Sequence, residues 1–431
     1  MSILFKNADI LSVKDGRFEY LQCAYLGVEG KVIDYIGTEA PVKEYSEVKE
    51  MSGKMLIPGL VNSHGHTAMN LLRGLGSSLD LQQWLAIMWP IEDRMRDEDC
   101  ANGMNMAILE MLASGTTSFC DMYMSPGHTQ ACIGESGMKA NLTRVMMGGF
   151  KDTDYRLFSN RLEALEFVRQ YDNAYDGRLR ADWSMHAEYT IDAEVARKWA
   201  EETTGLGGRF HVHISETRKE HEDCIKRYGM TPAAWMEETG FFKIPTYAAH
   251  CVWCTEEDLQ ILSSHQVSVV HNPSSNMKLG SGFAPIPRML ELGINVALGT
   301  DGAASNNNLN MFEEMHLAAI IHNGYVNDPV AMKAETVLKM ATINGAALQQ
   351  RLDTGSLEVG KKADIVAVNL DAPHMKPNLD PLALLVYSAQ ASDVTMTMVD
   401  GRILYEGGEY LTLDKERIIR EFEDSLRYLY R

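Results

Sequence analysis

Residues 55–70 read "MLIPGLVNSHGHTAMN", an apolar run that ends in two histidines, His64 and His66. A short apolar run of this kind predicts a buried β-strand. Side chains two positions apart lie on the same side of a strand, so both histidines can reach one metal ion. The stretch therefore predicts a strand with two histidines at its end, which form a metal site only if the rest of the chain supplies further ligands.

Similar apolar runs recur along the middle of the chain, among them "TTSFCDMY" (116–123), "GRFHVHISE" (208–216) and "INVALGTDG" (294–302). Amphipathic stretches separate most of them, a pattern typical of βαβ units around a parallel sheet. We expect eight strands between residues 55 and 302, the number that closes a (β/α)8 TIM barrel of about 250 residues. A doubly wound open sheet is the alternative.

The two ends of the chain read differently from the middle. The first 50 or so residues and the last 75 contain short β-rich runs with glycine-containing turns, such as "EGKVIDYIG" and "DGRILYEGG". Neither end has enough strands for a sheet of its own. We therefore predict one small β-sandwich domain built from residues 1–55 and 356–431, with the catalytic barrel, residues 56–355, inserted between them.

Composition excludes several classes of protein. The 431-residue chain has a net charge of −19, which disfavours binding to nucleic acid. Its seven cysteines show no disulfide framework, and its first residues do not resemble a signal peptide, so we expect a cytoplasmic protein. No apolar run approaches the roughly 20 residues of a membrane span. The expected partner is a small molecule, and a homo-oligomer is compatible with the sequence.

Polar residues gather where the predicted strands end. The fifth strand ends in His211 and His213 with Glu216 close behind, the sixth in His250, the seventh in His271 and Asn272, and the eighth in Asp301. Each residue alone is more often structural. Together they favour a shared site, because the carboxyl ends of barrel strands meet at one rim, where barrel active sites lie.

Histidines with one carboxylate favour Zn²⁺, with Fe²⁺ or Mn²⁺ as lesser options. His64, His66, one of the pair His211 and His213, and Asp301 would leave an open position for water, which is typical of a catalytic site. Strand geometry does not choose between His211 and His213. The fourth strand offers "SMHAEYT", without the lysine that often bridges two metals, so we expect one ion per subunit.

Five stretches together resemble the amidohydrolase superfamily, and more closely its S-adenosylhomocysteine/5′-methylthioadenosine deaminase branch. They are "PGLVNSHGHTAMNLLRG", "HVHISETRKE", "AAHCVW", "HNPSSNMKLGSGFAP" and "LGTDGAASNNNLNMFEEM", and the likeness runs essentially from end to end. The resemblance implies a zinc ion held by His64, His66, His213 and Asp301. His213 is chosen because Glu216 follows it at the family's His-x-x-Glu spacing.

The resemblance also implies roles for other residues. Glu216, His250 and Asp301 take the positions that handle protons, and Glu216, Asp301 and Ser305 also contact the substrate. Glu92 matches the position that binds ribose hydroxyls, and His186 one that meets the purine. Arg144 of "LTRVMM" matches an arginine that faces the carboxylate of a homocysteine tail, and Arg161 is a weaker match to a second one.

One departure from the family pattern concerns substrate choice. Where the family often reads His-x-Pro-Tyr, this chain reads "HAEY", which puts Glu188 near the expected purine pocket. An added carboxylate there could favour a different heterocycle or a cationic tail.

The implied function is zinc-dependent hydrolytic deamination of an adenosine derivative, namely S-adenosylhomocysteine, 5′-methylthioadenosine, 5′-deoxyadenosine or adenosine. The 6-amino group is replaced by a 6-oxo group, and ammonia leaves. The alternative on the same scaffold is hydrolysis of another aromatic C–N or C–Cl bond, as in guanine or a triazine. A binding module that has lost turnover is disfavoured because every expected ligand and acid is present.

Overall fold

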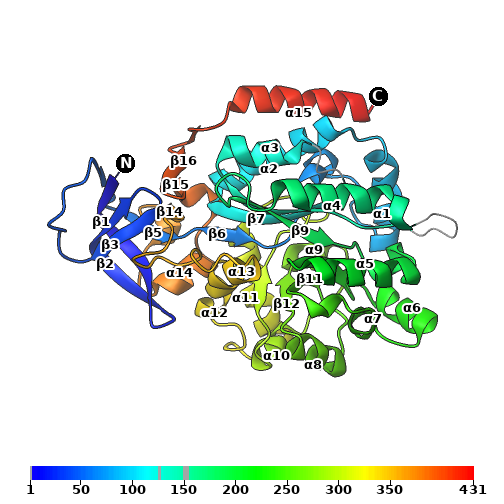
Figure 1. Cartoon of the computed structure of the whole chain (residues 1–431). Coiled ribbons are helices and arrows are strands. Elements are labelled where there is room, and N and C mark those ends of the chain that lie inside the picture. The colour runs from blue at the N-terminus through cyan, green and yellow to red at the C-terminus, as the bar shows by residue number, and fades with distance from the viewer. Residues whose placement is uncertain (1, 125–127, 149–154) are drawn as a thin grey trace.

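A computed structural model describes residues 2–124, 128–148 and 155–431 of the chain. Its β-strands form two bodies, a parallel sheet rolled into a barrel and a mixed sheet beside it (Figure 1). Both ends of the chain contribute strands to the mixed sheet. Within the described residues, no helix combines the length and apolar character needed to cross a bilayer.

The barrel consists of eight parallel strands that pair with their neighbours in chain order. The backbone N–H of Ser63, just after the first strand, donates to the carbonyl oxygen of Leu298 in the last strand at 2.9 Å, which brings the two edges together. The predicted (β/α)8 barrel is confirmed. Its strands are β6 (Leu60–Asn62), β7 (Thr116–Tyr123), β8 (Lys139–Arg144), β9 (Leu179–Ser184), β10 (Phe210–Ile214), β11 (Thr246–His250), β12 (Ser268–His271) and β13 (Val296–Leu298).

Amphipathic helices surround these strands. In α5, for example, Asp192 caps the first turn by accepting from the N–H of Glu194, and Ala196, Trp199 and Ala200 face the core at helical spacing. The helices of the barrel region are α1 (Leu81–Glu92), α2 (Asp97–Ala113), α3 (Thr129–Ser136), α4 (Ser159–Tyr171), α5 (Ala193–Leu206), α6 (Arg218–Tyr228), α7 (Pro232–Thr239), α8 (Glu256–Ser264), α9 (Pro273–Lys278), α10 (Ile286–Glu291), α11 (Met311–Val326), α12 (Ala334–Met340) and α13 (Ile343–Leu348).

The second sheet joins strands from both ends of the chain, as predicted. Its order is β17-β16-β15-β14-β5-β1-β2-β3, and β4 pairs with β1. Phe5, Ile10, Leu26, Ile365 and Met398 belong to its buried apolar cluster. The strands are β1 (Ser2–Lys14), β2 (Arg17–Glu29), β3 (Val32–Gly37), β4 (Glu47–Glu50), β5 (Lys54–Pro58), β14 (Ile365–Asn369), β15 (Val394–Val399), β16 (Arg402–Glu406) and β17 (Glu409–Tyr410). The domain boundaries given above stay a prediction.

The apolar run at residues 55–64 is not one strand, as the sequence suggested, but two. β5 belongs to the mixed sheet and β6 to the barrel, with Gly59 between them. A Cβ atom at Gly59 would lie 2.1 Å from Oγ1 of Thr117, so only glycine allows this close passage. The chain thus enters the barrel directly before His64.

Two helices lie toward the C-terminus. α14 (Pro381–Tyr387) packs against α11 and α12. α15 (Lys415–Leu429) lies across α2 (Figure 1), where Nδ2 of Asn102 donates to Oγ of Ser425 at 3.0 Å. The C-terminal segment therefore contacts the barrel helices as well as the mixed sheet.

Candidate active site

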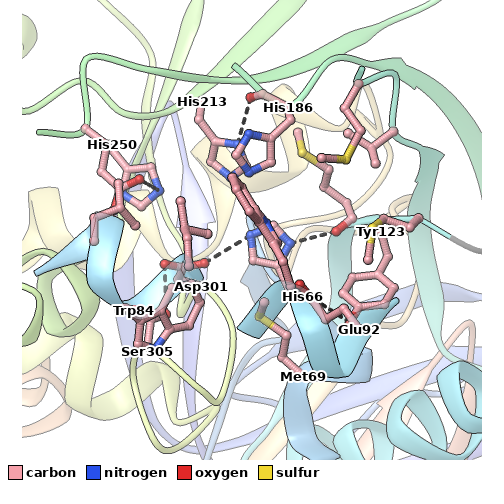
Figure 2. Close-up of a pocket in the computed structure, with 18 of the residues that line it drawn as sticks. His66, Met69, Trp84, Glu92, Tyr123, His186, His213, His250, Asp301 and Ser305 are labelled. Carbon is pink, nitrogen blue, oxygen red and sulfur yellow. Dashed lines mark hydrogen bonds and ion pairs between the residues drawn. The ribbon is translucent and has the colours of Figure 1, made fainter. Parts of the chain in front are cut away.

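The first histidine pair is fixed at the rim of the barrel, directly after β6. Nδ1 of His64 lies 2.9 Å from Nε2 of His211, and Nδ1 of His66 lies 2.6 Å from the carbonyl oxygen of Met122. These contacts orient both rings, so that Nε2 of His64 lies 3.4 Å from Oδ1 of Asp301. Nε2 of His66 lies 3.2 Å from the same oxygen (Figure 2).

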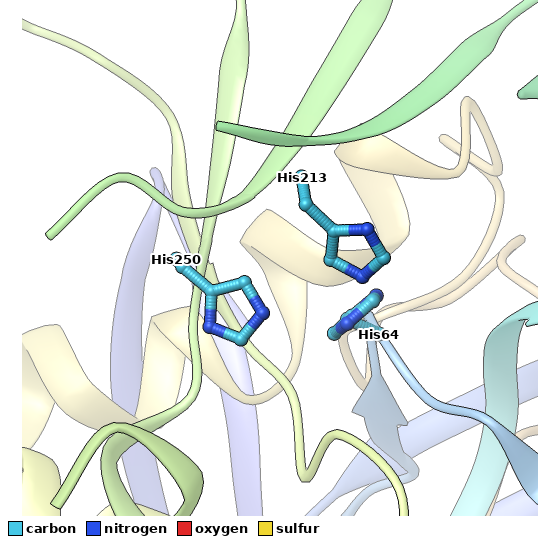
Figure 3. A group of neighbouring side chains, drawn as sticks. All are labelled: His64, His213 and His250. Atoms are coloured by element: carbon cyan, nitrogen blue, oxygen red, sulfur yellow. The ribbon is translucent and has the colours of Figure 1, made fainter. Parts of the chain in front are cut away.

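Strands β10 and β11, the fifth and sixth of the barrel, add His213 and His250. Nδ1 of His213 lies 2.8 Å from the carbonyl oxygen of His186, and Nδ1 of His250 lies 2.9 Å from Oδ1 of Asn276. The rings of His64, His213 and His250 converge, with one nitrogen from each within 4.8 Å of the others (Figure 3).

The two histidines of β10 occupy different places in this arrangement. His213 lines the pocket and joins the cluster, whereas His211 lies behind it and holds His64.

The cluster fits a divalent metal ion. His64, His66 and Asp301 form a second group whose ligand atoms lie within 4.8 Å of one another. Nε2 of His64 is fully buried and has no hydrogen-bond partner in the described part of the chain. A buried nitrogen without a partner is costly unless something binds it, and imidazoles with a carboxylate are ligands that divalent transition metals and zinc prefer.

The Asp301 carboxylate is held in place by its surroundings. Oγ of Ser275 donates to its Oδ2 at 2.6 Å, and Oγ of Ser305 donates to the same oxygen at 3.0 Å. The backbone N–H of Gly302 donates to Oδ1 at 2.8 Å. Because these donors fix the carboxylate, its free lone pairs point in a defined direction.

Several residues of the site adopt a backbone conformation that side chains disfavour. Ser215, His250 and Asp301 have φ angles of 48°, 73° and 62°, in the left-handed region that favours glycine. Such strain persists only where the surrounding structure compensates for it, and it is common at active sites. Each angle occurs at or near the end of a barrel strand.

Glu216 lies beside this cluster, in the loop between β10 and α6. Its Oε2 is 3.9 Å from Nε2 of His250, and its side chain lines the pocket. Burial raises the pKa of Glu216 above its usual value, and the charge of His250 opposes this only in part. A carboxyl group with a raised pKa is suited to donate a proton near neutral pH.

A pocket opens over these residues, and Glu92, His186 and Ser305 line it as the resemblance implied (Figure 2). Glu92 is the last residue of α1, and the hydroxyl of Tyr123 donates to its Oε1 at 2.7 Å. Burial raises the pKa of the Glu92 carboxyl. The pocket therefore contains a hydrogen-bonding carboxyl group in addition to the histidine cluster.

The rest of the pocket wall is mostly apolar, a feature that the sequence analysis did not identify. α1 contributes much of this wall, because "LQQWLAIMWPIE" turns one face with Trp84 toward the pocket. The helical spacing of the apolar residues just before Glu92 could have predicted this apolar wall. The wall consists of Met69, Leu81, Trp84, Leu85, Trp89, Met122, Tyr123, Met124, Val145, Met147, Tyr189 and Leu279.

Arg144 and Arg161 do not face this pocket in the part of the chain that the structure describes. Nε of Arg144 donates to Oε2 of Glu163 at 2.7 Å, and Nε of Arg161 donates to Oε2 of Glu202 at 2.7 Å. Both guanidinium groups are thus paired with carboxylates of the protein. The role predicted for them, binding of a substrate carboxylate, stays a prediction.

Glu188 also lies outside the pocket lining, whereas its neighbour Tyr189 is part of it. The Glu188 side chain is buried and forms an ion pair with Arg227 of α6. The carboxylate expected near the purine therefore has a protein partner.

Comparisons with known proteins agree with this geometry. Residues 55–404 match the sequence model of the Amidohydrolase family. A 5-methylthioadenosine/S-adenosylhomocysteine deaminase of Acetivibrio thermocellus is 43% identical over 97% of both chains. A 5′-deoxyadenosine deaminase of Methanosarcina acetivorans is 40% identical over 97% of this chain and 96% of its own. The crystal structure of an adenosine deaminase from Xanthomonas campestris with bound zinc superimposes with a TM-score of 0.91, at 30% identity, over 99% of this chain and 98% of the other.

Proposed function

This chain belongs to the amidohydrolase family, and from that premise we propose that it is a metal-dependent hydrolase that deaminates the adenine ring of an adenosine derivative. The observation that carries the proposal is the position of the raised-pKa carboxyl of Glu216. It lies 3.9 Å from His250 and lines the same pocket as the metal-ligand cluster. The deaminase activities named for the 40–43% identical relatives support the same reaction.

We assign the metal ligands to His64, His66, His213 and Asp301, with one zinc ion per subunit and Fe²⁺ or Mn²⁺ as the lesser options. When bound, such an ion supplies a Lewis acid that makes water nucleophilic near neutral pH. Three imidazoles and one carboxylate leave room for water and substrate, as catalytic sites require.

The proton steps are assigned to the chain's own side chains. Glu216 donates a proton to ring nitrogen N1, which makes C6 electrophilic, and Asp301 accepts a proton from the water that adds to C6. His250, 3.9 Å from Glu216, orients that water by hydrogen bonding. Asp301 then passes its proton to the amino group, which leaves as ammonia, and Glu216 recovers a proton from the new hydroxyl at C6. Acid–base assistance of this kind contributes about 10²–10⁴-fold in rate.

Substrate recognition is assigned to other side chains that line the same pocket. Glu92, held by the Tyr123 hydroxyl, accepts hydrogen bonds from the ribose hydroxyls. His186 has a buried Nδ1 without a hydrogen-bond partner among the described residues, and this nitrogen is available to the purine. Ser305, which already donates to Asp301, contacts the substrate near the reacting carbon.

The lining of the pocket favours an apolar group at the 5′ position of the ribose. Trp84, Trp89, Met124 and Met147 contribute to its wall, and the described lining includes neither lysine nor arginine. A methylthio group or a 5′-deoxy carbon buries apolar surface there. A homocysteine carboxylate, in contrast, would pair with Arg144 only after Arg144 gave up its bond to Glu163. We therefore expect 5′-methylthioadenosine and 5′-deoxyadenosine to be better substrates than S-adenosylhomocysteine.

A cytoplasmic location fits the seven cysteines, none of which forms a disulfide. The homo-oligomer compatible with the sequence stays a prediction.

The test is loss of adenine ultraviolet absorbance together with ammonia release, measured with zinc-loaded protein. The panel holds 5′-methylthioadenosine, 5′-deoxyadenosine, S-adenosylhomocysteine, adenosine, guanine and a chlorotriazine. We expect turnover of the adenosines, with the apolar 5′ derivatives highest in kcat/KM. Turnover of guanine or release of chloride, without turnover of any adenosine, would move the function to the alternative reaction.

A further inference from the structure

An ion pair with a buried carboxylate joins a segment of the pocket wall to α6. Glu188 begins the short 3-10 turn η3 (Glu188–Thr190), and its carboxylate pairs with the guanidinium group of Arg227, near the end of α6. The Glu188 side chain is 1% exposed and that of Arg227 is 37% exposed, so the carboxylate is almost entirely shielded from solvent. Since the next residue, Tyr189, lines the pocket, this pair anchors a part of the pocket wall to α6.

The opposite end of α6 holds the loop that carries Glu216. Glu220, in the first turn of this helix, accepts the backbone N–H of Ser215 at 2.9 Å through Oε1. Through Oε2 it accepts the backbone N–H of Glu216 at 2.7 Å and that of Thr217 at 3.3 Å. One carboxylate thus holds three consecutive amides, and the first of these residues has a left-handed φ of 48°.

The two carboxylates are neighbours. Burial and the adjacent charge of Glu188 raise the pKa of Glu220, and α6 packs directly against η3. The guanidinium group of Arg227 neutralises the buried carboxylate of Glu188, which would be costly to bury without a partner. Loss of charge at Glu188 would leave Arg227 without its carboxylate partner and weaken the attachment of α6 to η3.

We infer that Glu188 is a positioning residue: through Arg227 it fixes α6, and through Glu220 of that helix it fixes the backbone that presents Glu216 to the substrate. The inference rests on the proposed function for the role of Glu216, but the contacts themselves do not depend on the substrate. A displacement of about 1 Å in a reacting group can cost on the order of 10²-fold in rate, so a device of this kind has kinetic consequences.

The direct test is Glu188→Gln, which keeps the size of the side chain and removes its charge. We expect kcat for the best adenosine substrate to fall about 10- to 100-fold, with KM changed less than about threefold, because Glu216 acts in the chemical step. Hydrogen–deuterium exchange of the peptide that contains residues 215–217 should become about tenfold faster. This second readout does not depend on turnover.

The matched control is Glu222→Gln on the same helix. Glu222 also pairs with an arginine, Arg218, at 2.7 Å, but both side chains are exposed. We expect neither kcat nor the exchange of residues 215–217 to change, because exposed pairs contribute little.

Arg227→Gln extends the test. It should reproduce the effect of Glu188→Gln, and the double variant should lose no more than either single variant, as expected for two residues that act as one unit. If Glu188→Gln does not fold, Arg227→Gln carries the same comparison from the more exposed partner.

Equal kcat and equal exchange in Glu188→Gln and Glu222→Gln would overturn the inference, and so would additive losses in the double variant. Failure of the wild-type protein to turn over any adenosine would refute the proposed function instead. In that case the exchange rates alone would still decide whether Glu188 holds the Glu216 loop.

Discussion

At the scale of single residues, the histidines of the cluster and Asp301 are each held by a second contact. His64 is oriented by His211, His66 by the carbonyl of Met122, and Asp301 by Ser275 and Ser305. Glu216 differs, because its carboxylate faces the pocket and its position is set by its backbone. Glu216 is thus separate from the side chains assigned to the metal, although its carboxyl group lines the same pocket.

Glu216→Gln tests this separation. We expect kcat to fall about 10²–10⁴-fold, because the amide cannot donate the proton that N1 requires. KM should change little, and the metal content of the purified protein should equal that of the wild type, since Glu216 is not among the assigned ligands. Steady-state kinetics with metal analysis on the same sample checks both. A kcat within about tenfold of the wild type would assign the proton donor elsewhere.

The sequence predicted residues whose position follows from the strand they end. His64, His66, the pair His211 and His213, and Asp301 could be grouped because the carboxyl ends of parallel strands meet at one rim. The choice of His213 from that pair came from the family resemblance. Arg144 could not be placed in this way. It also ends a strand, β8, but its guanidinium group donates to Glu163 of α4. A pairing between a strand and a helix that are separated in sequence has no local sequence pattern that would predict it.

At the scale of elements, the proposed preference for the 5′ substituent rests on α1 and β8. α1 presents Trp84 and Trp89 to the pocket, and β8 ends in an arginine that is already paired. The eight barrel strands were predictable from their apolar runs, whereas the inward face of α1 depends on how that helix docks over the rim. The expected preference for an apolar 5′ group therefore comes from the structure.

Arg144→Ala tests how much an acidic tail depends on β8. We expect kcat/KM for S-adenosylhomocysteine, already lower than for 5′-methylthioadenosine, to fall at least about tenfold further, because a charge-assisted hydrogen bond is lost. The value for 5′-methylthioadenosine should change little. Glu163→Gln is the reverse variant: it frees Arg144 and should raise the ratio of the two values in favour of S-adenosylhomocysteine. Equal losses on both substrates in Arg144→Ala would dispose of the tail-binding role.

Glu314 of α11 is a buried carboxyl group that hydrogen-bonds to residues at the barrel rim. Its Oε1 accepts from Nδ2 of Asn306 at 2.7 Å and its Oε2 from the backbone N–H of Ser274 at 3.1 Å, and burial raises its pKa from 4.5 to about 8. A carboxyl whose folded-state pKa is raised favours the folded state below its unfolded pKa and loses that contribution as pH rises through the folded value.

The free energy of unfolding should therefore fall between pH 4.5 and about 8 relative to that of Glu314→Gln, by about 1.4 kcal/mol for each pH unit. Denaturant titrations of both proteins across this range measure the difference. The same pH dependence in wild type and variant would show that Glu314 titrates near its unfolded value.

At the scale of the whole molecule, the barrel and the mixed sheet meet over a buried charge cluster. Lys139 begins β8 and is 1% exposed, and its Nζ lies 2.6 Å from Oδ2 of Asp364 and 2.6 Å from Oδ1 of Asp400. The two aspartates adjoin β14 and β15 of the mixed sheet. That both chain ends form one sheet was predictable from their turns, but this contact joins residues 225 or more positions apart and was not.

Lys139→Ala should therefore destabilise the whole chain by about 3–5 kcal/mol, because it leaves two buried carboxylates without a cation. The matched control is Lys31→Ala, which removes a pair between the mixed sheet and the barrel region, with Asp176 at 3.4 Å, in which both side chains are exposed. That variant should lose at most about 1 kcal/mol.

Denaturant unfolding of the two variants beside the wild type measures the difference in stability. The kcat of folded Lys139→Ala should stay near the wild-type value because the cluster lies away from the catalytic rim. Equal stability of the two variants would mean that the buried cluster contributes no more than the exposed pair, and that apolar packing alone joins the two bodies.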